Sequence, residues 1–509
     1  MMKSCKEMLV VIIVAYSSAV NAQFTVDLKG IVIKKIPTLL EEQAEVTITS
    51  LTPATNTMEP LALGYLSNGT HIDIPLKYLD RIHFYSSDIR DFWVVQALNT
   101  GVYEWLIQKG YQRDIRMSLD KEVTDLNDSY LKSNKFFADD YLEDYLYTIV
   151  HEIHPGTIKD GRPGHLSIKV LKDPSPNAVV YSNGMIHINT GLISLIDSEE
   201  ELKGILAHEI AHFVLDHHVK NRIEKEEKEK KAAAWAAFAT ALAATTDIYL
   251  TSKNENHIPG LLTAGTAVIS YSVLEAVKDN LGTKYSINQE LEADRVALNY
   301  LSMSGVDSTA LSSVFEKMRL HHIKNGEYFA LASNGSHPSL DDRILNIGEP
   351  NLSKFSNKEF HRKVSMVNSQ TANTEYYLNH YEQGENIINK SIESGVATER
   401  DYILKAMLLM RMYDTPLMNK NALGFIERAK KLNVSPSFHA FKQEGLLMLR
   451  MEDFEGAKIA FGKYKDGLLK VISSLSTEII VLNNNHSIIS YYQEELEWVK
   501  IMIYKSGEF

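Results

Sequence analysis

Two histidines and a glutamate stand together in a pattern that could hold and use a metal ion. His208, Glu209 and His212 lie in a stretch whose apolar neighbours indicate a helix. Residues four apart share one face of a helix, so both histidines can present a ring nitrogen to the same ion. Glu209 could take a proton from a zinc-bound water, whose pKa the metal lowers toward 7. The spacing therefore predicts peptide-bond hydrolysis at a zinc centre.

A catalytic zinc also needs a third protein ligand and an open position. Glu290 and Asp294 are four residues apart on a second predicted helix. We expect Glu290 to ligate the ion and Asp294 to accept the N–H of His208, which fixes the orientation of that ring. His218 is a rival ligand, but on a continuous helix it lies about 9 Å beyond the motif along the axis. We therefore interpret His217 and His218 as solvated helix residues.

The elements that must position these residues are helices around a small sheet. Residues 86–150 have mostly helical periodicity, whereas 166–170 and 178–181 alternate as strands do. Asn183-Gly184 is a hairpin turn that leads into a further strand at 185–188. The predicted sheet therefore lies directly before the motif in the chain.

The motif helix is expected to begin after Asp197, a good N-cap, and to continue to about Lys231. On the second helix, Glu292 points away from the face of Glu290 and Asp294, so we expect it at the surface.

Composition limits the classes of function. The 509 residues are enough for two or three domains, and 53 basic against 65 acidic residues give a net charge of −12. This acidic balance gives no general electrostatic reason to bind nucleic acid or an anionic membrane. Lys3 and Lys6, the apolar run after them and the small residues before position 23 indicate a signal peptide over 1–22. The single cysteine, Cys5, lies within it, so a processed chain has no disulfide.

Four segments follow from these patterns. After the signal peptide we expect a β-rich region of unknown role over 23–85 and a metallopeptidase domain over 86–355. A helical domain is expected over 370–509. There, small and aromatic residues have the spacing of one tetratricopeptide (TPR) repeat; they are Phe441, Gly445, Met448, Ala457 and Phe461. The expected fold class is α+β, in which the protease domain is mainly helical, of the zincin type, with a small sheet.

With these motifs in order, the chain resembles the gluzincin peptidase family of HtpX, the CAAX prenyl proteases and periplasmic BepA. The resemblance covers about residues 135–350. It rests on Gly184, on the His208–His212 motif, on the Glu290–Asp294 segment, and on His337-Pro338 with Arg343.

The resemblance implies that His208, His212 and Glu290 bind one Zn²⁺ per chain. It also implies that Glu209 is the base and that Asp294 supports a ligand. In BepA-like members a histidine before proline can fill the open position of the metal, and His337 matches it; its alternative is a structural role in a turn. The strand at 178–181 either binds substrate at an exposed edge or is an internal core strand.

Two apolar segments, Ala232–Ala244 and Gly260–Leu274, are each shorter than the roughly 20 residues of a membrane-spanning helix. They could form a lid or touch a membrane surface, so membrane contact is expected to be peripheral at most. The resemblance implies an exported protein, either free in the periplasm or peripheral to the outer membrane.

The expected function is degradation of misfolded or stalled envelope polypeptides, with envelope partners bound through the C-terminal repeats. Two alternatives remain at this point. One is a non-proteolytic assembly factor with a structural zinc, and the other is a membrane-associated processing peptidase.

Overall fold

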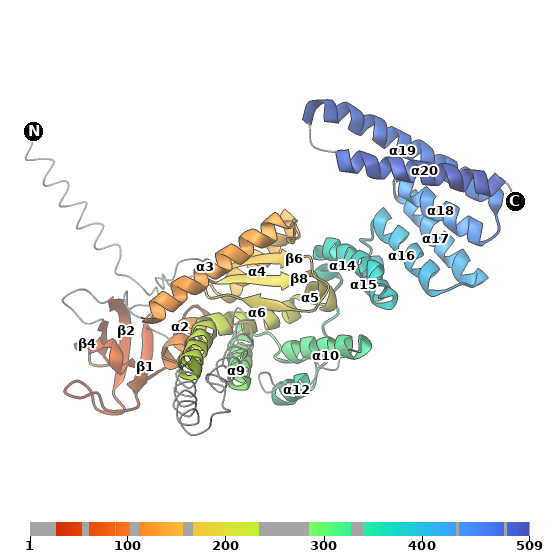
Figure 1. Cartoon of the computed structure of the whole chain (residues 1–509). Helices are drawn as coiled ribbons and strands as arrows, with labels where there is room; N and C mark the ends of the chain where they lie inside the picture. Colours follow the sequence, from red (N-terminus) through yellow and green to blue (C-terminus); the bar gives the residue numbers. More distant parts are fainter. Residues whose placement is uncertain are drawn as a thin grey trace, which may run out of the picture. The chain divides into compact units, whose positions relative to one another are not determined.

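The computed structural model describes residues 27–52, 61–86, 88–101, 111–155, 166–233, 285–326, 339–433, 437–482 and 486–507. The predicted signal peptide and His337 lie outside the described residues. So do the segment Gly260–Leu274 and most of Ala232–Ala244. The described chain is an α+β structure with two small sheets and many helices (Figure 1), as the sequence predicts. It divides into two units, one of which contains residues 200–355 and the other residues 356–509.

The first unit begins with an antiparallel five-stranded sheet of order β4-β3-β2-β1-β5, drawn in red and orange in Figure 1. A 3₁₀ helix, η1 (Leu76–Arg81), precedes the last strand. The strands are β1 (Leu28–Val32), β2 (Glu45–Thr52), β3 (Leu61–Leu66), β4 (His71–Pro75) and β5 (Ile82–Phe84). Alternate strand residues, among them Val32 and Ile48, form one buried face against Val94 and Leu98 of helix α2 (Ile89–Asn99). This sheet therefore carries its own hydrophobic core.

Helix α2 also connects this core to the helices around the motif. The indole N–H of Trp93 donates to the carbonyl of Ile153 at the end of α4 (Asp140–Ile153). The Trp93 ring stacks on Tyr300 of α9 (Ile287–Ser304), with centroids 5.4 Å apart. Since α9 carries Glu290 and Asp294, α2 fixes the position of that helix.

The second sheet has the order β6-β8-β7 and consists of β6 (Ser167–Leu171), β7 (Ala178–Val180) and β8 (Met185–Asn189). Gly184 has φ +82°, which the predicted Asn183-Gly184 turn requires, and Ala178 pairs with Ile188 across the hairpin. In Figure 1, α3 (Tyr111–Lys132) and α6 (Glu199–Val214) lie on opposite sides of this sheet. β7 is an edge strand among the described strands, so the alternative of an internal strand is wrong.

The motif helix is shorter than predicted. α6 begins at Glu199 and ends at Val214, so Asp197 is not its N-cap. The chain then turns at Leu215-Asp216, with Asp216 at φ +58°, and a new helix begins at residue 217. Asp216 forms a buried ion pair with Arg116 of α3. Aspartate tolerates the left-handed conformation, so this tertiary ion pair can override the local helical pattern.

Two further helices complete the first unit, α10 (Thr309–Lys324) and α12 (Leu340–Ile347). Gly204 of α6 lies against the backbone of Leu311 in α10, where a Cβ would be 3.4 Å from the Leu311 Cα. The buried carboxylate of Glu201 also pairs with Lys317, at 2.7 Å. Through these two contacts, α10 packs directly against the motif helix α6.

The second unit contains the short helix α5 (Thr190–Leu195) and the helical C-terminal part. Its other helices are α13 (Lys358–Lys363), α14 (Ser365–Tyr377), α15 (Tyr381–Glu393), α16 (Glu399–Met412), α17 (Pro416–Leu432), α18 (Phe438–Arg450), α19 (Phe454–Leu482) and α20 (His486–Gly507). Gly445 of α18 contacts the ring of Phe461 in α19. A small residue thus lies where two helices touch, as the repeat pattern predicts. None of the described helices is long and apolar enough to cross a bilayer.

Candidate metal centre

The predicted ligands come together at one point inside the first unit. The Nε2 atoms of His208 and His212 are 3.1 Å apart. An oxygen of the Glu290 carboxylate lies 3.4 Å from the first of these nitrogens and 3.8 Å from the second. All three side chains are buried, and they form a group that could hold a metal ion. α6 supplies both histidines and α9 the glutamate, so the site is formed where these two helices meet.

These separations fit zinc. Four ligand atoms in a tetrahedron at about 2.1 Å from the metal are separated by about 3.4 Å. The three separations, 3.1, 3.4 and 3.8 Å, lie close to that value. Two histidine nitrogens and one carboxylate oxygen are also the donor set of many catalytic zinc sites. The residues therefore fit the metal that the sequence predicts.

Each histidine has a partner at its outer ring nitrogen, and these partners orient the two inner nitrogens toward one common point. Nδ1 of His208 lies 2.9 Å from the carboxylate of Asp294, as the sequence predicts. Nδ1 of His212 lies 2.8 Å from Nδ1 of His217, whose other nitrogen lies 3.3 Å from Glu292. If both ligands carry their proton on Nδ1, each directs a lone pair on Nε2 to the same point. Their geometry is thus prepared for metal binding.

His217 and Glu292 correct two expectations. His217 is fully buried and His218 is 3% exposed, so neither is a solvated helix residue. The turn at Leu215-Asp216 changes the direction of the chain and brings His217 back against His212. Glu292 is only partly exposed, and its pKa is lowered by the hydrogen bond from His217. The chain of contacts from His212 through His217 to Glu292, here called the relay, cannot be predicted from a continuous helix, because it depends on the turn.

His218 is not a metal ligand in this arrangement. Its Nε2 atom contacts the main-chain oxygen of Val180 and the hydroxyl of Tyr285, the latter at 2.6 Å. Tyr285 stacks on His212 with ring centroids 3.6 Å apart. The rival interpretation of His218 as the third ligand therefore has no geometric support, and the residue connects strand β7 to the wall of the site.

Arg343 of α12 is the cation of the site. It donates two hydrogen bonds to Asp294, at 2.6 and 2.8 Å, and lies 3.3 Å from an oxygen of Glu290. Its guanidinium also stacks over the ring of Phe315 at 3.8 Å. Burial raises the pKa of Asp294, but Arg343 and His208 outweigh it and bring that pKa to about 2. Arg343 therefore keeps the carboxylate charged and in place behind His208.

Negative charge nevertheless dominates around His208. Burial and Arg343 lower the pKa of His208, but Asp294 and Glu290 outweigh them and raise it to about 9. A buried imidazole whose charged form is favoured lies in a field that attracts cations. The pocket therefore offers a divalent ion both donor atoms and charge compensation.

Glu209 lies beside the ligands but is not one of them. Burial raises the pKa of its carboxyl to about 7, in the range of an effective general base at neutral pH. One carboxylate oxygen accepts a hydrogen bond of 3.1 Å from the main-chain N–H of Val180 in the edge strand β7. The candidate base therefore lies between the metal ligands and the edge of the sheet.

This fold and site define a metalloendopeptidase domain, in which two helices bring a His-Glu-x-x-His motif and a distant glutamate together. Residues 143–351 match the model of the family described as Peptidase family M48, so the chain carries a peptidase M48 domain.

Curated relatives agree with this class. Over 281 residues the chain is 27% identical to the mitochondrial metalloendopeptidase OMA1 of Schizosaccharomyces pombe, which covers 52% of this chain and 72% of that protein. It is 24% identical to the putative beta-barrel assembly-enhancing protease of Vibrio cholerae, over 46% of this chain and 44% of that protein. It is 25% identical to the metalloprotease YcaL of Escherichia coli, over 30% of this chain and 51% of that protein. The chain thus spans about half or less of the two bacterial relatives.

Proposed function

We propose that this chain is a zinc-dependent endopeptidase in which His208, His212 and Glu290 hold the ion and Glu209 is the general base. One observation carries the proposal. The three donor atoms lie within 4.8 Å of one another, and each histidine has a hydrogen-bonding partner at its outer nitrogen. A purely structural site has no need of a carboxylate such as Glu209 beside it, with a pKa close to neutrality.

Zinc bound by these residues would supply Lewis-acid activation of a water molecule and of the scissile carbonyl. The protein supplies the proton transfers. The Glu209 carboxylate accepts a proton from the attacking water and then gives it to the nitrogen of the leaving amine, so no proton is gained or lost over the cycle. Burial of this carboxylate keeps competing bulk water away from the transfer.

Strand β7 is the proposed binding edge for a polypeptide substrate. The register of β7 with β8 directs the main chain of Val179 toward β8 and that of Ala178 and Val180 away from it. The outward groups of Val180 already contact Glu209 and His218. Ala178 is therefore the residue of β7 at which an extended substrate would pair, close to Glu209.

We further propose that the protein is exported to the periplasm and acts on misfolded or stalled polypeptides of the cell envelope. The signal-like residues 1–22 and the similarity to proteins named beta-barrel assembly-enhancing proteases support this location. OMA1 of fission yeast is named as mitochondrial, so location differs within this group of relatives. Detection of the native protein in periplasmic rather than cytoplasmic fractions is the test.

Casein degradation tests the catalytic role of Glu209. The Glu209→Gln protein should lose roughly 10²–10⁴-fold in cleavage rate, the usual contribution of a general base, and it should retain its metal. The control is Glu224→Gln, which removes an equal charge from an exposed helix. Cleavage by Glu209→Gln at the wild-type rate would contradict the proposal. If zinc is bound but neither wild type nor either variant cleaves casein, the result would favour the non-proteolytic alternative.

A further inference from the structure

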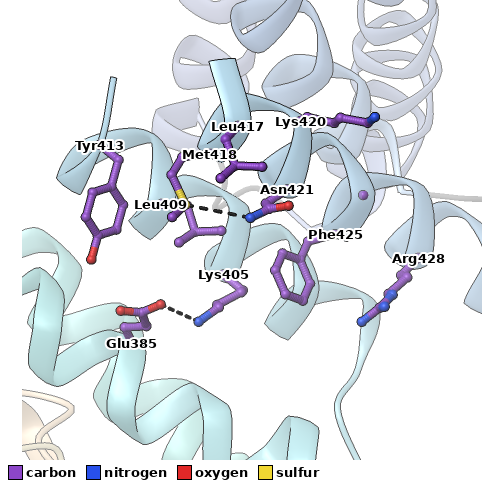
Figure 2. Close-up of a pocket in the computed structure, with 11 residues that line it drawn as sticks. Glu385, Lys405, Leu409, Tyr413, Leu417, Met418, Lys420, Asn421, Phe425 and Arg428 are labelled. Carbon is purple, nitrogen blue, oxygen red and sulfur yellow. Dashed lines mark hydrogen bonds and ion pairs between the residues drawn. The ribbon is translucent and has the colours of Figure 1, made fainter. Parts of the chain in front are cut away.

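The helical unit contains a groove of about 700 Å³ that the peptidase chemistry does not use. Its walls come from α15, α16 and α17 (Figure 2). In Figure 2, Tyr413 and Arg428 lie at opposite ends of the view, with Lys405 and Phe425 between them. The volume falls within the range of known ligand pockets.

One face of α17 is left uncovered along this groove. Leu417, Asn421, Gly424 and Arg428 follow one another at helical spacing and all line it. The opposite face is buried in the helical unit, through Asn419, Ala422, Ile426 and Ala429. A Cβ at Gly424 would meet no atom within 4 Å, so another chain can approach the α17 backbone there.

The groove carries uncompensated positive charge. Lys405 is paired with Glu385 at its floor and also donates to Asn389, at 2.8 Å. Within the described part of the chain, no acidic side chain pairs with Lys420 or Arg428. The guanidinium of Arg428 instead lies 5.4 Å from the centroid of the Phe425 ring. In a protein of net charge −12, two unpaired cations on one groove form a local site for negative charge.

Apolar side chains lie next to these cations. Leu417 is 65% exposed and Tyr413 is 41% exposed, so a bound chain could cover both side chains. Phe425 and Leu409 add apolar surface within the groove. A ligand that fits therefore combines negative charge with at least one apolar side chain. A free small anion lacks the second feature.

We propose that this groove binds an acidic peptide segment of a polypeptide client, with carboxylates near Lys420 and Arg428 and an apolar side chain against Phe425 and Leu417. The proposal rests on the proposed function in one respect, namely that the clients of this protein are polypeptides. It adds a binding site in a different unit and specifies the chemistry that the site selects.

The test is a binding measurement on the full-length Glu209→Gln protein, which should not cleave the peptide probe during the measurement. The probe is a fluorescein-labelled ten-residue peptide in which aspartates and glutamates flank one leucine and one phenylalanine. A matched peptide carries lysines in place of the acids. Fluorescence anisotropy should show binding of the acidic peptide only. Raising the salt from 50 to 300 mM should weaken that binding, because exposed charges are screened.

Two substitutions identify the groove. Arg428→Glu should weaken binding about tenfold, since it replaces an attraction with a repulsion of similar size. Lys470→Glu, an exposed position on α19 outside the groove, makes the same charge change and should have no effect. Gly424→Leu places a side chain into the open space and should abolish binding. It leaves the helix intact or strengthens it, because glycine is a poor helix former.

The proposal is overturned if both peptides bind equally, if Arg428→Glu and Lys470→Glu weaken binding to the same extent, or if Gly424→Leu binds as well as the parent protein. Circular dichroism of Gly424→Leu checks that its helices are retained. A protein that binds the acidic peptide but whose Glu209-containing form does not cleave casein would preserve this inference and remove the proposed function.

Discussion

At the scale of single residues, the site depends on side chains that hold the ligands as much as on the ligands themselves. Asp294 and His217 occupy equivalent places behind the two histidines, one at Nδ1 of His208 and the other at Nδ1 of His212. The first could be predicted from four-residue spacing on one helix. The second could not, because it depends on a turn at Leu215-Asp216. Asp216 in that turn forms an ion pair with Arg116 of another helix.

Replacing His217 should therefore weaken the metal site without removing a ligand. His217→Phe keeps an aromatic ring in the buried space but offers no acceptor to Nδ1 of His212. We expect a zinc affinity lower by about 10–100-fold, as for other residues that orient a ligand. Competition with a chromophoric chelator measures this affinity. Glu292→Gln retains an acceptor oxygen and should lose much less. Equal affinities for wild type and His217→Phe would show that the relay has no role.

Another buried histidine makes stability depend on pH. His187 on β8 is 1% exposed, lies among the rings of Tyr130, Phe136 and Tyr181, and has no hydrogen-bond partner among the described residues. Burial lowers its pKa to about 4. Its pKa in the unfolded chain is about 6.5, so the unfolded state binds the additional proton between these values. The contribution of His187 to stability is therefore fully present above pH 6.5 and is lost progressively as the pH falls toward 4.

The effect should be about 2 kcal/mol at pH 5 relative to pH 7.5. His187→Phe removes the titrating group and should remove this part of the pH dependence in urea unfolding at the two pH values. His71→Gln, at an exposed position, serves as control. An unchanged difference between pH 7.5 and pH 5 in His187→Phe would mean that the ring is accessible to protons in the folded protein.

At the scale of elements, the motif helix is fixed from two sides. Its ligand-bearing face meets α9, and Glu201 near its beginning pairs with Lys317 of α10. Both charged side chains are almost completely buried. A buried ion pair adds little to stability relative to an apolar pair, but loss of one partner leaves an uncompensated charge.

Lys317→Met should therefore destabilise the protein by about 3–5 kcal/mol, because the buried Glu201 carboxylate loses the positive charge that faces it. The double variant Glu201→Leu/Lys317→Met should recover most of this loss. Chemical denaturation of the three proteins measures both steps. If the double variant is as unstable as the single one, the pair contributes through packing rather than through charge.

The strand elements were predictable because their signals are local. The Asn183-Gly184 turn and the alternation on both sides of it gave the β7–β8 hairpin within a residue of its ends. The predicted end of the motif helix, at about Lys231, is wrong, because α6 ends at Val214 while the residues after it keep a helical pattern. What ends the helix is a left-handed Asp216 with a distant ion-pair partner, and no local signal encodes that partner.

At the scale of the whole molecule, spacing within single helices allowed the three ligand candidates and Asp294 to be named from the sequence. Positions that depend on how helices pack could not be derived in this way. The support by Arg343, the stacking of Tyr285 on His212 and the open groove on α17 all require neighbours from other elements. The α+β class followed from composition and periodicity, whereas the identification of TPR repeats stays a prediction.

Metal content measured by mass spectrometry shows whether His208, His212 and Glu290 hold one zinc ion per chain. We expect about one zinc per chain in wild type and in Glu209→Gln. Glu290→Gln should lose most of its metal, whereas Glu224→Gln should retain it. Full zinc occupancy in Glu290→Gln, or no bound metal in wild type, would contradict the ligand assignment and the proposed mechanism with it.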